Sequence, residues 1–250
     1  MAEGPGFELD TLTLALDRVL GVALGCGAGV VVSLTVFPAR AVSAAVETAG
    51  RVAALLARQM QILSKKEPSL RGEHGALAAQ VRENLVRLGD LAEEAEHERR
   101  GRATRYSGTP RLLRTLRRLR HDTDMLRRAG RDIGTDALPA SIAAPWCEAA
   151  ESAAETLRGI ERLLAGGKVP GDFDTLTPAV RAYLGALEDI RKSAEAATLP
   201  PATLRRMFGL GFTLDQFRRD IGDMIEIAQE VPKPRPGLVA AMRGWWLARA

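Results

Sequence analysis

Cysteine, histidine and aromatic residues are scarce in this chain, and each shortage excludes a class of site. The 250 residues include two cysteines, Cys26 and Cys147, so neither a disulfide framework nor a cysteine-based zinc site can form. Three histidines leave few candidates for general-base catalysis. Aromatic residues make up only 4% of the chain. Because β-branched residues are also sparse outside one segment, the composition favours helices over sheets. We therefore expect an all-α protein with no cofactor and no enzymatic activity.

Motifs that bind phosphate or metal ions are incomplete. The glycine-rich segment 166–171 lacks the Gly-Lys-Ser/Thr ending and the preceding strand of a phosphate loop, so it reads as a helix stop and turn. Glu94 and His97 have E-x-x-H spacing, but a carboxylate-bridged di-metal bundle needs a second such pair, and none occurs. Neither a nucleophile elbow nor a dinucleotide-binding fingerprint is present. These observations predict no catalytic, cofactor-binding or metal site.

Charge is plentiful, although the net balance is small. The formal net charge is +4 and the sequence pI is about 9.4, which implies mild attraction to anionic surfaces. Many arginines crowd residues 99–131, and we expect Arg111, Arg114 and Arg118 to contact anionic lipid headgroups. The alternative is a solvated helix face paired with the acidic run at residues 93–98. Nucleic acid is not an expected partner, because neither interleaved aromatic residues nor a recognised DNA-binding motif accompanies the charge.

One uncharged apolar run, residues 19–37, has the length of a membrane-spanning helix. Small residues recur in it at every fourth position, a spacing typical of close packing between membrane helices. The four small residues are Gly21, Gly25, Gly29 and Ser33. Basic residues follow the run, whereas the segment before it is acidic, so the positive-inside rule places everything after Pro38 in the cytoplasm.

Two other interpretations of the apolar run remain open. A signal peptide would explain the Ala-Arg-Ala sequence at residues 39–41, but the preceding segment is acidic and the run is longer than a secretory core. A buried helix of a water-soluble protein would also be apolar. We predict a single-pass protein of the bacterial inner membrane, with membrane helices of a partner subunit or of another copy beside it.

Six segments after the apolar run carry apolar residues at alternating spacings of three and four, which predicts helices with one buried face each. The segments are residues 42–63, 77–92, 112–126, 142–164, 176–194 and 207–228. Because the connections are mostly short, we expect an antiparallel helical bundle over residues 39–231. An intermolecular coiled coil is the alternative for heptads of this length.

Prolines and glycines divide these segments. Thr109 and Pro110 predict a helix start, with the threonine as N-cap. Gly166 predicts a helix end, and Asp172 the start of the next helix. Prolines then mark residues 232–236, which we expect to link the bundle to a short tail. Trp245 and Trp246 stand beside arginines in that tail, a combination expected at a membrane interface, although a frayed tail is the alternative.

Three segments together resemble the fusaric acid resistance (FUSC) family, also called the aromatic acid exporter family. They are residues 15–40, with an Arg-x-x-Gly start and an apolar-Pro exit, the arginine-rich segment 114–129, and the segment 207–220 (MFGLGFTLDQFRRD). The segments occur in the same order as in the family. The resemblance implies inner-membrane permeases that export aromatic carboxylic acids, with about six membrane helices before a cytoplasmic helical region.

This chain departs from that plan, because only one spanning segment is expected and no solute pathway can be built from one helix. We therefore expect an accessory or C-terminal part of such an efflux permease, in which transport requires additional membrane helices. The expected regions are residues 1–38 with the membrane helix, residues 39–231 with the bundle, and residues 232–250 with the tail. The alternative is a single-pass, membrane-anchored helical scaffold with no transport role.

Overall fold

The structure is a computed structural model that describes residues 16–29, 40–65, 71–101, 108–131, 138–168 and 174–231. It divides into two units, Met1–Arg40 and Ala41–Ala250, and each is described by itself. All regular secondary structure in the described ranges is helical, which confirms the expected all-α class.

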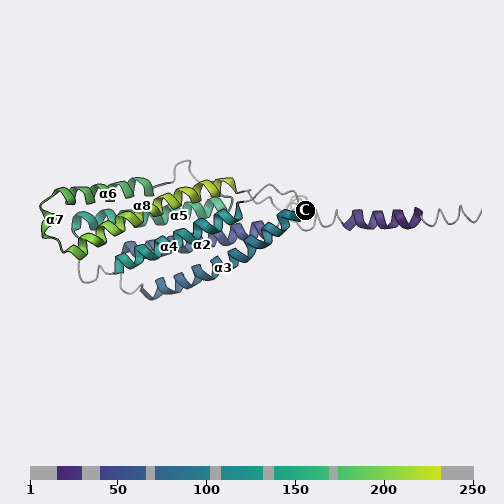
Figure 1. The fold of residues 1–250 in the computed structure, drawn as a ribbon, viewed down its shortest axis with the longest axis horizontal. Coiled ribbons are helices and arrows are strands. Elements are labelled where there is room, and N and C mark those ends of the chain that lie inside the picture. Colours follow the sequence, from purple (N-terminus) through teal and green to yellow (C-terminus); the bar gives the residue numbers. More distant parts are fainter. Residues whose placement is uncertain are drawn as a thin grey trace, which may run out of the picture. The chain divides into compact units, whose positions relative to one another are not determined.

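The larger unit is a bundle of long helices, as predicted. The helices are α2 (Arg40–Lys65), α3 (Arg71–Gly101), α4 (Thr109–Arg131), α5 (Ala140–Leu164), α6 (Leu176–Lys192), the short α7 (Glu195–Thr198) and α8 (Pro201–Glu230). Helices α3 and α6 lie at opposite edges of the bundle, and α2, α4, α5 and α8 lie between them (Figure 1). An extensive contact joins α4 and α8, which are far apart in the sequence.

The core consists of the apolar faces that the sequence pattern predicts. We call the row of apolar residues at alternating spacings of three and four on each helix its seam. Nearly every seam position is buried, and the largest fully buried side chains are Trp146 on α5, Tyr183 on α6 and Phe217 on α8. Ala194 is an exception, because α6 ends at Lys192 and leaves this alanine exposed. The predicted seam therefore runs two residues beyond the helix that carries it.

Helix α2 is buried on more than one face. Ala45, Ala49 and Ala53 are fully buried, and small side chains of this kind allow neighbouring helices to approach closely. At Gly50, an added Cβ would stand 3.8 Å from the Cβ of Leu164 on α5. The alanine-rich sequence of α2 thus places it in the interior of the bundle.

Helix ends follow the predicted punctuation, with small shifts. Gly166 adopts φ 78° after α5, its N–H bonds to Leu163 O, and the Gly167 N–H bonds to Arg162 O, so glycine ends the helix as expected.

Asp174 caps α6, because its Oδ1 accepts hydrogen bonds from the N–H groups of residues 176 and 177 at 3.1 and 3.2 Å. The predicted start at Asp172 lies outside the described residues and two residues before this cap. At α4, the Gly108 carbonyl accepts the first helical bond at 2.9 Å, one residue before the predicted N-cap Thr109.

Helices α6 and α8 approach closely at Gly211. A Cβ added there would lie 2.7 Å from Leu187 Cδ1 and 3.3 Å from Leu184 Cδ2, both on α6. One turn away, the buried Tyr183 hydroxyl donates a hydrogen bond of 3.0 Å to Met207 O of α8, and burial raises the pKa of this phenol. A side chain at position 211 would therefore require Leu187 of α6 to shift.

We expect opposite effects from placing alanine at two neighbouring glycines of α8. Gly209→Ala should raise the free energy of unfolding by about 0.5–1 kcal/mol, because an added Cβ has nothing within 4 Å and alanine favours the helix. Gly211→Ala should lower it by about 1 kcal/mol through overpacking against Leu187. Urea unfolding of both variants, followed by circular dichroism, measures the difference. Equal effects at the two positions would contradict the close approach of α6 and α8.

The smaller unit contains a helix over residues 16–29, and all of its residues are exposed. Across the described parts of the chain, no helix combines the length and apolar character that crossing a membrane requires. The second half of the expected membrane run, residues 30–37, lies outside the described ranges and includes Ser33.

Candidate functional site

The arginine-rich helix α4 directs its charges to two neighbours. Arg111 and Arg118 form ion pairs with acids of α8, whereas Arg114 and Arg117 line a groove shared with α3. The spacing of these residues explains the division, because positions 111 and 118 are two turns apart on one side of a helix. We describe the two sides in turn.

On the α8 side, the ion pairs define the register of the helices. Arg111 Nη1 lies 3.3 Å from Glu230 Oε2, and Arg118 Nη2 lies 2.5 Å from Asp223 Oδ2. Since the lower-numbered residue of α4 pairs with the higher-numbered residue of α8, the two helices run antiparallel. The Arg111 pair is exposed on both sides and adds little to stability.

Arg118 also reaches a buried acid. Its Nε lies 3.2 Å from Oδ1 of Asp220, which is only 2% exposed. The Gln216 amide donates a second hydrogen bond, of 3.4 Å, to the same oxygen. Asp220 is thus a buried carboxylate held by one arginine and one amide, an arrangement that compensates part of its desolvation.

A second carboxyl group, that of Asp122 on α4, is buried beside Asp220. Asp122 is 6% exposed, and its Oδ2 has no hydrogen-bond donor among the described residues. Burial, the charge of Asp220 and a side-chain hydrogen bond with Asp220 raise the pKa of Asp122 to about 7, against the opposing charge of Arg118. We call Asp122 and Asp220 the acid pair.

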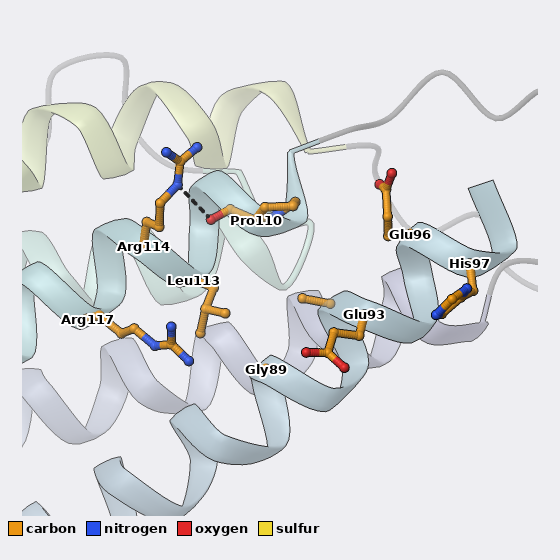
Figure 2. Close-up of a pocket in the computed structure, with 9 residues that line it drawn as sticks. Gly89, Glu93, Glu96, His97, Pro110, Leu113, Arg114 and Arg117 are labelled. Atoms are coloured by element: carbon orange, nitrogen blue, oxygen red, sulfur yellow. Dashed lines mark hydrogen bonds between the residues drawn. The ribbon is translucent and has the colours of Figure 1, made fainter. Parts of the chain in front are cut away.

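On the other side of α4, an open groove of about 410 Å³ lies between α3 and α4 (Figure 2). We call it the α3–α4 groove. The lining residues are Gly89, Ala92, Glu93, Glu96 and His97 from α3, and Pro110, Leu113, Arg114 and Arg117 from α4. Acidic side chains thus come from one helix and basic side chains from the other, over an apolar floor.

Two contacts shape the basic wall of the α3–α4 groove. Arg114 Nε donates a hydrogen bond of 3.4 Å to Pro110 O, drawn as a dashed line in Figure 2. Arg117 Nη2 lies 3.7 Å from the place where a Cβ on Gly89 would stand, so the glycine leaves room for the guanidinium. The groove presents charges of both signs to solvent and can bind a partner that carries both.

The three arginines expected to contact lipid divide between two sides of α4. Of the arginines, Arg111 and Arg118 pair with acids of α8, and Arg114 faces the α3–α4 groove. The ion pairs of Arg111 and Arg118 therefore lead to α8, which the sequence did not indicate. Trp245 and Trp246 lie outside the described residues.

The glycines expected to pack against membrane helices lie on the helix over residues 16–29. Gly21, Gly25 and Gly29 are exposed there, and an added Cβ at any of them would have nothing within 4 Å. The two residues of the E-x-x-H pair do not line the same site. His97 lines the α3–α4 groove together with Glu93 and Glu96, whereas Glu94 does not line it. Among the described residues, no cluster of three or more histidine, cysteine, aspartate or glutamate side chains can hold a metal ion.

Sequence reasoning missed the acid pair, although a signal was present. Asp122 lies three residues after the buried Leu119, and Asp220 lies three residues after the buried Phe217. Both aspartates therefore occupy positions that continue an apolar seam, where a carboxyl group is unusual. No protein-family model, curated protein or solved structure matches this chain.

Proposed function

We propose that this chain is an accessory or C-terminal part of an inner-membrane efflux permease of the aromatic acid exporter type. In this proposal the apolar run of residues 19–37 is the membrane anchor. The bundle is a cytoplasmic assembly or regulatory domain, and additional membrane helices supply the transport pathway. The resemblance of three ordered segments to the exporter family supports this assignment.

The observation that carries the proposal is the exposure of an apolar helix. Leu20 and Leu24 are 63% and 79% exposed, and Val19 and Val22 are exposed to a similar extent. Burying such side chains gains about 1.5–3 kcal/mol each, so an apolar helix of this kind favours lipid or a partner helix over water. The strip of Gly21, Gly25 and Gly29 is open and would let a partner backbone approach closely.

The bundle supports an assembly role rather than a solute pathway. Its core is closed by large side chains such as Trp146 and Phe217, which are buried among the apolar faces of neighbouring helices. Substrate-carrying helices would therefore come from another subunit.

Replacing Gly25 and Gly29 together with leucine should weaken assembly in the membrane at least about tenfold, because two large side chains would fill the strip. The double variant stays apolar, so membrane insertion should be retained. Crosslinking in isolated membranes and light scattering of the detergent-solubilised chain measure the oligomer.

Gly27→Leu is the matched control for this experiment. Gly27 is an equally exposed glycine of the same helix, but it lies away from the strip of Gly21, Gly25 and Gly29. This variant should assemble like the wild type. A full-length chain that is recovered as a monomer in water, without detergent or membrane, would refute the proposal.

A membrane-anchored scaffold is the second candidate, and one observation favours it. Phe208 and Phe212, one turn apart on α8, are 44% and 77% exposed, and the α3–α4 groove is open. Exposed aromatic side chains in a chain with few aromatics are typical of interaction surfaces. A scaffold would bind cytoplasmic proteins through these features without any transport.

Genetic context and phenotype distinguish the two candidates. An adjacent reading frame that encodes about five hydrophobic helices would favour the permease, and its absence would favour the scaffold. A deletion strain should become more sensitive to aromatic carboxylic acids only in the first case.

A further inference from the structure

The acid pair lies at the extensive contact between α4 and α8. Asp122 and Asp220 are both more than nine-tenths buried, so water cannot solvate two negative charges there. Two carboxyl groups at such a site are tolerated when they share a proton or when cations balance both.

The cations near the acid pair do not balance two negative charges. Arg118 is the charged partner of Asp220, but its side chain is half exposed and also binds Asp223, which reduces what it contributes to the acid pair. Among the described residues, the charged groups that act on Asp122 are Asp220 from α8 and Arg118 from α4, with none from α3. Nearby arginines are held elsewhere, since Arg218 pairs with Asp215 and Arg127 with Asp124.

The hydrogen bonding also requires a proton. Asp122 lies one turn after Arg118 on α4, and Arg118 Nε is 3.2 Å from Asp220 Oδ1, so the two carboxyl groups are brought to the same place in the contact. Asp122 Oδ2 finds no donor in the described part of the chain. Two carboxyl groups form a hydrogen bond only when one of them is protonated, because an ionised carboxylate is an acceptor alone. The hydrogen bond between the two carboxyl groups is therefore formed when the acid pair holds one proton and one negative charge, and Arg118 balances that charge.

We propose that the acid pair is a proton-binding site whose occupancy holds α4 against α8. With the proton bound, the Asp122 hydroxyl donates to Asp220. When the proton leaves to solvent water, two carboxylates face each other in the core of the contact and α4 separates more readily from α8. Proton concentration thus controls how tightly this side of the bundle is closed.

The acid pair loses its proton in the folded state near neutral pH. The pKa of Asp122 is raised from the ordinary value of 3.8 to about 7 in the folded state. At pH values between these two, the folded state therefore holds a proton that the unfolded state has released. Stability therefore falls as pH rises from about 4 to 7 and levels off above that range. The carboxyls of Asp215 and Glu188, whose pKa values are lowered by their arginine partners, take up protons only at more acidic pH.

Asp122→Asn tests this inference in the full-length chain, because asparagine can still donate to Asp220 but cannot ionise. We expect the Tm of the wild type to fall by about 4–8 °C between pH 5 and pH 8.5. Asp122→Asn should remove most of this fall and melt above the wild type at pH 8.5. Asp124→Asn is the control, since this partly exposed neighbour pairs with Arg127 and should leave the wild-type slope in place.

Hydrogen exchange of the wild type provides a second readout that needs no variant. After correction for the intrinsic rate, amides of α4 and α8 near the acid pair should lose protection about tenfold between pH 6 and pH 8. Amides at the centre of α5 should lose less. A wild-type Tm that does not fall with pH, an equal slope in Asp122→Asn, or uniform loss of protection would each overturn the inference. Should Asp122→Asn fail to fold at any pH, Asp220→Asn must flatten the slope instead, because it removes the charge that faces Asp122.

Discussion

Replacing Trp146 with alanine should lower the free energy of unfolding by about 3–5 kcal/mol, the largest loss that we expect from one substitution. Trp146 is 1% exposed and lies on α5, which has extensive contacts with both α6 and α8. Removing the indole would leave a cavity in the core, and close-packed interiors refill such spaces only in part. Urea unfolding of the full-length chain, followed by circular dichroism, measures the loss.

Val86→Ala is the control for the tryptophan substitution. Val86 is 66% exposed on α3, so its truncation removes apolar atoms without opening a cavity. The change should alter stability by less than about 0.5 kcal/mol. If Trp146→Ala cost no more than Val86→Ala, α5 would not be packed as the structure describes.

Replacing Arg118 with methionine should lower the free energy of unfolding by about 2–4 kcal/mol at pH 8. Removing one partner of a buried ion pair costs about 3–5 kcal/mol, because the other charge stays buried. The lower range applies here because the Arg118 side chain is half exposed. The loss should shrink at pH 5, where Asp122 holds a proton and the acid pair carries a single charge.

Arg51→Met is the matched control for Arg118→Met. Arg51 pairs with Glu47 on α2 at 2.5 Å, but both side chains are more than half exposed. Pairs of this kind contribute about 0.3–0.5 kcal/mol, so this variant should unfold almost like the wild type. A loss in Arg118→Met that is equally small, or that is the same at pH 5 and pH 8, would contradict the role of Arg118 at the acid pair.

The helices were largely predictable because burial leaves a periodic trace in the sequence. Ile142, Trp146, Ala149 and Ala153 follow one another at alternating spacings of four and three along α5, and all four are buried. Gly166 marked the end of α5 because few other residues adopt its positive φ. The start of α6 was harder to place, since Asp172 and Asp174 are both suitable caps and only the structure distinguishes them.

The partners of charged residues were not predictable. The sequence shows that Arg111 and Arg118 lie on one side of a helix, but not which helix faces them. Acids close in the sequence were the natural expectation, whereas the pairs lead to α8, where Glu230 and Asp223 are located. The pairing of Asp122 with Asp220 was hidden for the same reason, because the sequence places each aspartate beside an apolar face but does not show that the two faces meet.

Pairing α4 with the last helix has a consequence for synthesis on the ribosome. Arg118 and Asp223 are 105 residues apart in the sequence. At about 5–20 residues per second, roughly 5–20 s pass between the emergence of α4 and that of α8. During this interval α4 lacks its contact with α8, so we expect chaperones that bind apolar segments to recognise the nascent polypeptide. A premature stop codon before α8 would make this state permanent and direct the product to proteolysis.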